Sequence, residues 1–351
     1  MTRSIWATVP FWLAYLLPPL IIISVYNRGW FAALPIAVVF VLLPALDWLS
    51  GVAPIPREVP DLAFNNWFRI VTWLWVPVQI ALISWLVQTV PMDHLTTREI
   101  VAATISVGAT TGAIGMTFAH ELIHRRHGYE RMFGNILLAS VTYPHFAIEH
   151  VKGHHRHVGT PRDPATARLG ESIYRFLPRS VLGGIISAWH IERRRLWELE
   201  VRTWSRQNLM LRYLFVEAVI YASIAIALGP LAVTVFAGQS LVAIAILEII
   251  NYIEHYGLLR KKSKPWEYER IRAEHSWDSG NRVSNWLLIN LPRHSDHHMS
   301  AAKRYQTLEL LTHAPRLPGG YGAMFLLALV PPLWFRVMNP RVAAVRAIAP
   351  I

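Results

Sequence analysis

The amino-acid sequence predicts an all-α membrane protein, a bundle of about six transmembrane helices with a helical cytoplasmic cap. Hydrophobic residues make up 53% of the 351-residue chain and charged residues only 16%, with a mean hydropathy of +0.31. That balance differs from the composition of soluble proteins. Long apolar runs recur along the chain, and 29 of the 34 Lys and Arg residues lie in two segments, 121–212 and 257–351.

Six apolar runs are long enough to cross a hydrocarbon core, which takes about 20 helical residues. They are residues 8–26, 30–50, 67–90, 98–119, 212–233 and 237–256. The first run follows Arg3 and resembles a secretion signal, but it is long, contains Pro18-Pro19 and lacks a small-x-small cleavage pattern. We therefore interpret it as a retained span.

The two basic segments predict the cytoplasmic side, because Lys and Arg concentrate there in membrane proteins. Counting crossings then places the N-terminus in the cytoplasm and builds the cap from residues 120–211 and 257–351. A last apolar run at 321–338 is short and contains Pro331-Pro332, which favours an interfacial or re-entrant helix. No repeat or linker divides the chain, so we expect residues 1–351 to form a single domain, multi-pass in a bacterial inner membrane.

Composition also excludes several kinds of chemistry. The chain has no cysteine, so it holds no disulfide, thiolate nucleophile, cysteine-bound zinc, haem-thiolate or iron–sulfur cluster. The formal net charge of +12 does not indicate nucleic-acid binding, because no basic strip with interleaved aromatic residues is present. Any metal must be bound by His, Asp or Glu.

Sixteen histidines gather mainly at the predicted cytoplasmic ends of spans. Three clusters repeat a spacing of four, in His120 and His124, in His150 and His154, and in His294 and His298, and residues so spaced share one helix face. With their neighbours, the candidate metal ligands are His120, His124, His150, His154, His155, His255, His294, His297 and His298. A single histidine is more often structural, but three clusters with one period favour a metal site.

Nine imidazoles are too many for one ion, whereas two ions with four or five ligands each would use them all. Imidazole suits zinc, copper, iron and nickel. A metal pair beside a lipid-embedded cavity has apolar molecules to act on, and activating dioxygen against a C–H bond requires a redox metal, which favours iron. The other histidines, including His127 and His145, are interpreted as solvated or structural.

Two interpretations of a different class remain open. The segment HELIH (120–124) matches the signature of a zinc metalloprotease, with Glu121 as general base, but it would leave seven histidines without a role. A metal transporter would carry ionisable groups along several spans, and the first four predicted spans carry almost none.

Carboxylates beside the clusters are candidates for hydrogen bonds that orient the imidazoles. Four of them directly adjoin a cluster histidine, and the fifth lies two helical turns before His255. They are Glu121, Glu149, Glu254, Asp296 and Glu248.

From about residue 110 onward, the sequence resembles the membrane-bound alkane 1-monooxygenases, and more distantly the xylene monooxygenases and the fatty acid desaturases and hydroxylases. The segments that carry the resemblance are EHVKGHHRHVGTPRDPA (149–165), ESIYRFLPRS (171–180), NYIEHYGL (251–258), HSWDSGNRVSNWLLINLPRHSDHH (275–298) and KRYQTLELL (303–311). It implies that the same nine histidines bind iron.

The resemblance further implies a non-haem diiron enzyme, without haem or flavin in this chain, that uses O₂ to convert medium-chain n-alkanes to 1-alkanols in hydrocarbon degradation. Electrons would come from a rubredoxin, reduced by an NAD(P)H-dependent rubredoxin reductase. A xylene-type methyl hydroxylase and a fatty acyl hydroxylase or desaturase are the alternatives of the same class.

Basic residues in the cap are candidates for docking this acidic donor. They are Arg125, Arg126, Arg156, Arg193, Arg194 and Arg195. In the fourth predicted span, Gly108, Gly112 and Gly115 either make room for a substrate channel or allow close helix packing.

Overall fold

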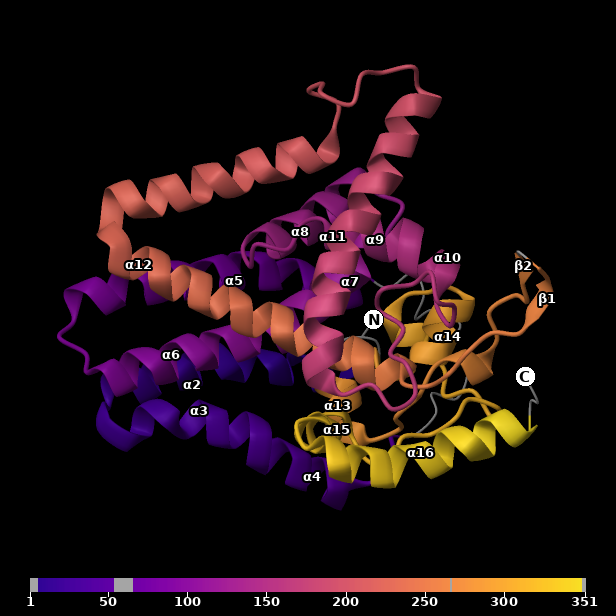
Figure 1. The fold of residues 1–351 in the computed structure, drawn as a ribbon. Helices are drawn as coiled ribbons and strands as arrows, with labels where there is room; N and C mark the ends of the chain where they lie inside the picture. Colours follow the sequence, from indigo (N-terminus) through magenta and orange to yellow (C-terminus); the bar gives the residue numbers. More distant parts are fainter. Residues whose placement is uncertain (1–5, 54–65, 266, 349–351) are drawn as a thin grey trace.

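In the computed structural model, residues 6–53, 66–265 and 267–348 are described. The described chain is mainly helical, with almost no strand, as predicted. The long apolar helices lie side by side in one part of the molecule, and the short helices that carry most of the histidines lie in the other (Figure 1).

Four of the predicted spans correspond closely to apolar helical segments. The first comprises η1 (Val9–Leu16) and α2 (Leu17–Tyr26). The second comprises η2 (Gly29–Ala33), α3 (Leu34–Ala37), the π-helical η3 (Val38–Leu42) and α4 (Leu43–Ser50). The third is α5 (Asn66–Met92). The fourth comprises α6 (Thr97–Thr110), the π-helical η5 (Thr111–Gly115) and α7 (Met116–Ile123).

The predicted fifth and sixth spans form one 47-residue element, α12 (Leu209–His255), which bends sharply and doubles back (Figure 1). The bend lies at Gly229, whose φ of 80° favours glycine, and Pro230 follows it without a backbone N–H. The predicted boundary at 234–236 was therefore wrong by a few residues. Within the described residues, five helical segments are long and apolar enough to cross a membrane, α12 being one of them.

The cap contains shorter elements. They are α8 (Gly128–Ala139), α9 (Phe146–Glu149), the π-helical η6 (His150–His154), α10 (His155–His157), α11 (Ile173–Glu198), η7 (Ala273–His275), α13 (Arg282–Leu287), α14 (His294–Met299) and η8 (Tyr305–Thr307). A small antiparallel hairpin of β1 (Lys262–Lys264) and β2 (Glu267–Tyr268) was not predicted. The apolar run near the C-terminus forms α15 (Tyr321–Ala328) and α16 (Pro331–Ile348), and neither is among the candidate spans.

The three glycines of the fourth span are packing positions. A Cβ atom on Gly108 would lie 2.6 Å from Val242 Cβ, and one on Gly112 would lie 2.7 Å from Ala243 Cα. A Cβ atom on Gly115 would lie 1.8 Å from Gln79 Oε1 of α5. The structure thus supports close helix packing at these residues rather than a substrate channel, and small residues at such crossings are the usual means of helix association in lipid.

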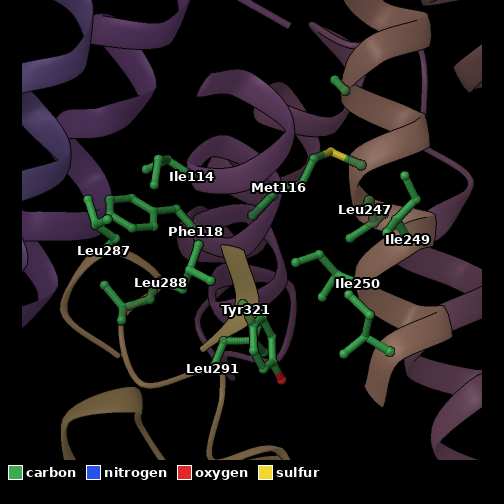
Figure 2. Close-up of a cluster of buried hydrophobic side chains, with 14 of the residues drawn as sticks. Ile114, Met116, Phe118, Leu247, Ile249, Ile250, Leu287, Leu288, Leu291 and Tyr321 are labelled. Carbon is green, nitrogen blue, oxygen red and sulfur yellow. The ribbon is translucent and has the colours of Figure 1, made fainter. Parts of the chain in front are cut away.

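The largest buried hydrophobic cluster joins the membrane helices to the cap. In this cluster Met116 of the fourth span lies toward Leu247 of α12, whereas Ile114 and Phe118 lie toward Leu287 of α13 (Figure 2). Tyr321 of α15 closes this cluster on the cap side. The ends of α7 and α12 are therefore fixed relative to each other, and both ends carry candidate ligands.

Candidate metal centre

The HELIH segment closes the fourth span. The helix continues to Ile123, beyond the predicted end at residue 119, so His120 lies within the helix and His124 is its C-cap. The two rings share one helix face, with centroids 5.0 Å apart. The predicted i,i+4 relation is therefore confirmed for this pair.

The second histidine cluster departs from α-helical geometry. Residues His150–His154 form the π-helical turn η6, in which hydrogen bonds span five residues rather than four. His150 consequently pairs with His155, their Nε2 atoms 3.1 Å apart, while His154 turns toward His255 and His298. The rings of His150 and His154 still stack on one face, as expected, with centroids 5.0 Å apart, but their ligand nitrogens belong to different groups.

The remaining candidate ligands come from α12 and α14. His255 is the last residue of α12, and His294, His297 and His298 lie on the six-residue helix α14. His294 and His298 face His255 as an i,i+4 pair, with His294 Nε2 3.1 Å from His255 Nε2. His297 points instead toward His120 and His124.

The nine predicted histidines form two groups, in each of which all ligand atoms lie within 4.8 Å of one another. The five-histidine group consists of His120, His124, His150, His155 and His297. The four-histidine group consists of His154, His255, His294 and His298. Seven of the nine side chains are buried, and His124 and His155 are half-buried. Rings of the two groups adjoin, with His155 and His298 centroids 4.5 Å apart.

The spacing of the nitrogen atoms fits metal ligation. Metal–nitrogen bonds of about 2.1 Å at right angles place two nitrogens about 3.0 Å apart. In the four-histidine group, His294 Nε2 lies 2.9 Å from His298 Nε2, which lies 3.3 Å from His154 Nε2. In the five-histidine group, Nε2 atoms of His120 and His124 are buried without a hydrogen-bond partner. Such orphaned lone pairs are costly unless they bind something.

Burial keeps most of these imidazoles neutral. Burial first, and neighbouring imidazoles second, hold the pKa well below its usual value at six of them. These are His124, His150, His155, His294, His297 and His298. A neutral imidazole offers a lone pair, so these side chains are ready to bind a cation at neutral pH.

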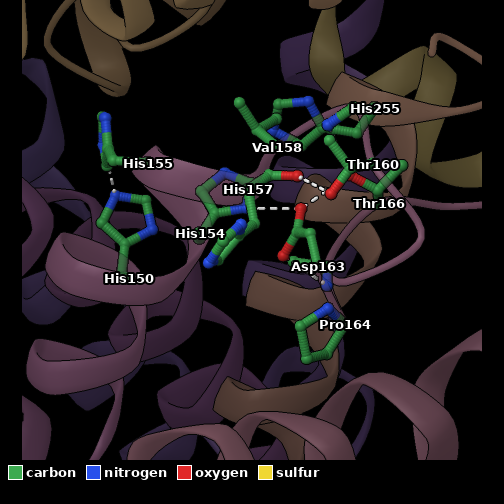
Figure 3. A network of polar contacts seen from close by, with 12 residues as sticks. His150, His154, His155, His157, Val158, Thr160, Asp163, Pro164, Thr166 and His255 are labelled. Atoms are coloured by element: carbon green, nitrogen blue, oxygen red, sulfur yellow. Dashed lines mark hydrogen bonds and ion pairs between the residues drawn. The ribbon is translucent and has the colours of Figure 1, made fainter. Parts of the chain in front are cut away.

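His154 has a carboxylate partner that was not predicted. Asp163 Oδ2 lies 2.9 Å from His154 Nδ1 and also accepts a 2.6 Å hydrogen bond from Thr166 (Figure 3). Burial alone lowers the pKa of His154, but the Asp163 carboxylate raises it above its ordinary value. Asp163 lies in the segment GTPRDPA, nine residues after His154. That spacing does not match a helical or strand period, so the sequence did not indicate this contact.

Glu254 lies beside the four-histidine group, as predicted from its position next to His255. Its carboxylate, however, contacts His294, with Oε2 3.3 Å from His294 Nε2. The other oxygen, Oε1, accepts a 2.8 Å hydrogen bond from the Tyr321 hydroxyl. This buried acid thus connects α15 to the ligand side of the group.

The other four predicted carboxylates contact different partners. Glu121 pairs with Arg125 at 3.3 Å. Asp296 accepts from Lys303 Nζ at 2.7 Å. Among the described residues, no hydrogen bond joins either carboxylate to an imidazole. Sequence adjacency to a histidine did not predict contact, because neighbouring helical side chains point about 100° apart.

Glu149 and Glu248 line a small polar cavity behind His150. Glu248 accepts hydrogen bonds from Tyr143 at 2.9 Å and Ser180 at 2.5 Å, and Glu149 accepts one from Ser187 at 3.4 Å. Burial, followed by the nearby Asp163, raises the pKa of Glu149 to about 8. Neither carboxylate bonds to an imidazole within the part of the chain that the structure describes.

The predicted docking arginines divide into two sets. Arg125 is buried and donates to the backbone carbonyls of Ala301, Ala302 and Lys303, so it is a structural residue and that prediction was wrong. Arg195 is half-buried and paired with Glu192 at 2.6 Å. The exposed members are Arg126, Arg156, Arg193 and Arg194.

An open basic groove of about 840 Å³ adjoins the second histidine cluster. We use this name for the surface lined by Lys152, Arg156, Arg162, Arg194 and Arg195, with His157 and His190. Arg156, which lines the groove, directly follows His155 of the five-histidine group in the chain.

The histidines outside the two groups are peripheral. His127 is exposed and stacks on Tyr129, and His275 pairs with Glu269 at 3.3 Å. His145 is buried against Tyr143 and lines the small polar cavity.

A narrow apolar cavity of about 80 Å³ lies between the second span, the fourth span, α12 and the cap. Its lining includes Val39, Phe40, Ala113, Ile250, Leu288 and Tyr321. Tyr321 both borders this cavity and donates its hydroxyl hydrogen to Glu254. The apolar cavity and the four-histidine group are thus separated by one tyrosine and one carboxylate.

Comparison with protein families defines the class of the chain. Residues 99–328 match the family model described as Fatty acid desaturase. The match covers nearly all of the fourth span and extends through α15. It includes all nine histidines of the two groups. The fold and the site are therefore those of a membrane oxidoreductase of the fatty acid desaturase class.

Individual relatives narrow the class. The chain is 39% identical to alkane 1-monooxygenase 2 of Pseudomonas aeruginosa over 92% of its own length and 86% of the relative. It is 40% identical to alkane 1-monooxygenase of Ectopseudomonas oleovorans over 97% of its own length and 85% of the relative. The hydroxylase component of xylene/toluene monooxygenase of Pseudomonas putida is 28% identical over 93% of the chain and 87% of the relative. The chain belongs to the alkane 1-monooxygenase family.

Proposed function

We propose that the protein catalyses the O₂-dependent hydroxylation of medium-chain n-alkanes to 1-alkanols at two iron ions held by the nine histidines. The observation that carries this proposal is the convergence of nine imidazoles, from segments between residues 120 and 298, into groups of five and four. The alkane 1-monooxygenase relatives support the substrate class.

Bound iron would supply the activation of O₂ and the attack on the terminal C–H bond, with water formed from the second oxygen atom after uptake of two electrons and two protons. The chain's own contribution is to place neutral imidazoles around both positions and to exclude water. Burial of seven of the nine side chains supports this role, because a dry and shaped cavity limits competing reactions.

The alkane would bind in the apolar cavity, with its terminal carbon toward Tyr321. The lining is aliphatic and aromatic except for Asp47, Ser284 and the Tyr321 hydroxyl. Asp47 and Ser284 satisfy each other by a 2.5 Å hydrogen bond. An alkane therefore meets little unpaired polarity there, as a substrate that offers no hydrogen bond requires. A methyl-substituted arene or a fatty acyl chain is the alternative substrate, and a panel of the three distinguishes them.

The electrons would come from a rubredoxin, itself reduced by an NAD(P)H-dependent reductase, docked over the basic groove. The groove carries five Lys and Arg side chains against the single acid Glu198. Positive charge of this kind attracts an acidic protein and raises its association rate. Arg156 would bring the docked partner next to His155 and shorten the path to the five-histidine group.

The whole chain, residues 1–351, is proposed to act as one domain in the bacterial inner membrane, with the N-terminus and the metal centre on the cytoplasmic side. The basic residues of the cap support this orientation. Trp30 and Trp48, exposed at opposite ends of the second span, match the positions of interfacial anchors.

Metal analysis and product identification on the purified full-length protein test the proposal together. We expect about two iron ions per chain and NADH-dependent conversion of octane to 1-octanol when rubredoxin and its reductase are supplied. Zinc in place of iron, or turnover of the arene or acyl substrate alone, would contradict it.

Charge reversal tests the docking surface. We expect Arg156→Glu with Arg194→Glu to raise the rubredoxin concentration needed for half-maximal rate by roughly tenfold at low salt, and the difference to shrink as salt rises. Arg341→Glu, on the exposed side of α16, is the matched control. If the groove variant and the control raised this rubredoxin concentration equally, the groove would not be part of the docking surface.

A further inference from the structure

The two histidine groups differ in the carboxylates that touch them. In the four-histidine group, Asp163 Oδ2 lies 2.9 Å from His154 Nδ1, and Glu254 Oε2 lies 3.3 Å from His294 Nε2. Across the described residues, no hydrogen bond or ion pair joins a carboxylate to an imidazole of the five-histidine group. The group with fewer nitrogen donors is therefore the one with anionic partners.

Both carboxylates are held firmly. Asp163 is fully buried, accepts hydrogen bonds from Thr166 Oγ1 at 2.6 Å and Ala165 N at 3.0 Å, and is thereby aimed at the His154 ring. Glu254 is buried and anchored by the Tyr321 hydroxyl at 2.8 Å. Asp163 is thus fixed by its own loop, and Glu254 is fixed by a residue of another element, α15.

A carboxylate bonded to the far nitrogen of an imidazole fixes the tautomer and makes the near nitrogen a stronger donor. Asp163 is bonded in this way to Nδ1 of His154, whose Nε2 faces His298. Glu254 lies instead at Nε2 of His294, on the ligand side of the group, so it acts through its charge. Negative charge close to a cation also stabilises the more positive of its oxidation states, especially at a buried site of low dielectric constant. Five neutral imidazoles provide neither effect. The fifth nitrogen donor favours binding in its own group, but it adds no charge.

We propose that Asp163 and Glu254 are positioning residues that make the two metal positions unequal. The ion in the four-histidine group is bound more tightly and favours its more oxidised state, whereas the ion in the five-histidine group favours the reduced state. This inference rests on the proposed pair of iron ions, and it assigns the difference between them to the two carboxylates beside the four-histidine group.

Mössbauer spectroscopy of the full-length holoenzyme, loaded with ⁵⁷Fe, tests the inference. We expect two signals of equal area from the unaltered protein. Asp163→Asn keeps the shape of the side chain but removes its charge. It should shift one signal and leave the other in place. The iron whose signal shifts should become about 10- to 100-fold easier to remove with a chelator.

Glu254→Gln provides an independent variant and should move the same signal as Asp163→Asn. Glu130→Gln is the matched control. This fully buried carboxylate pairs with Arg304 at 3.0 Å and touches no imidazole, so both signals should stay unchanged.

The outcomes separate this inference from the proposed function. If the unaltered protein lacks iron or does not hydroxylate octane, the proposed function fails. If it binds two irons and is active, but Asp163→Asn moves both signals or neither, or Glu254→Gln moves the other signal, the assigned inequality is overturned. If one of the variants Asp163→Asn and Glu254→Gln fails to accumulate, the other variant decides the outcome.

Discussion

The cap around the histidines and the second membrane span differ sharply in packing. In the cap, α14 is buried along almost its whole length and is surrounded by α7, η6 and α12. In the second span, the π-helical stretch Val38–Leu42 has no buried residue at all. The two ends of the second span are held in place. Gly29 N donates a 2.6 Å hydrogen bond to Glu99 at one end, and Ser284 donates to Asp47 at the other.

This contrast shows how one chain meets two demands. The proposed metal ligands must be kept in place to within a fraction of an ångström, and the buried contacts of the cap suit that demand. The apolar cavity is covered on one side by Val39 and Phe40 of the loosely packed span. We therefore expect substitutions in the cap to change iron content and stability, and substitutions in the span to change substrate use alone.

The largest effect is expected at a ligand in the cap. His255→Ala removes one nitrogen from the four-histidine group, and we expect at least about a 100-fold loss of activity, since even losing a partner of a ligand costs 10- to 100-fold. Iron content should fall toward one per chain, as measured by elemental analysis. The exposed His313→Ala is the control. Full activity of His255→Ala would instead favour a metal site formed by HELIH alone.

The next largest effect is expected at Arg125. Its guanidinium donates to Glu121 O at 2.8 Å and Ala302 O at 2.9 Å, which ties the HELIH helix to the loop after α14. Arg125→Ala removes the partner of these carbonyls and the cation beside the buried Glu121, and we expect about 3–5 kcal/mol lower stability. Thermal unfolding in detergent measures it, with the neighbouring exposed Arg126→Ala as control. Equal melting temperatures of the two variants would show that the cap does not depend on this contact.

The sequence predicted which histidines converge better than it predicted their surroundings. Histidine spacing identified the nine imidazoles that converge, because helical periodicity is a local property. It did not predict the π-helical turn that pairs His150 with His155, since one inserted residue per turn has no distinct signature in the sequence. It also missed Asp163, whose contact with His154 depends on the conformation of the loop after α10, and the burial of Arg125, which depends on contacts with residues 301–303 far along the chain.

A moderate effect is expected where the membrane helices meet. Gly112→Ala would place a Cβ atom 2.7 Å from Ala243 Cα, so η5 and α12 must separate, at a cost of about 1–3 kcal/mol. Because α12 carries His255, we expect partial loss of iron along with a lower melting temperature. Gly128→Ala meets no atom within 4 Å and is the matched control. An unaffected Gly112→Ala would mean that the rigidity of the cap does not extend into the membrane helices.

The smallest effect is expected in the second span. The ring of Phe40 lies 5.1 Å from that of Phe325 at the wall of the apolar cavity. Phe40→Ala lengthens the space available to a chain, and we expect the rate ratio of longer to shorter alkanes to rise by roughly 3- to 10-fold. Iron content should not change, because the span is only loosely packed against the cap. Competition between octane and dodecane, with products separated by gas chromatography, measures the ratio.

Phe31→Ala is the matched control for Phe40→Ala, since it removes the same ring from the same span at an exposed position. It should leave both the rate ratio and the iron content as they are. Loss of iron in Phe40→Ala would show that the span and the cap are coupled after all. An equal change in the rate ratio for Phe31→Ala would show that the ratio reflects contact with lipid rather than the cavity wall.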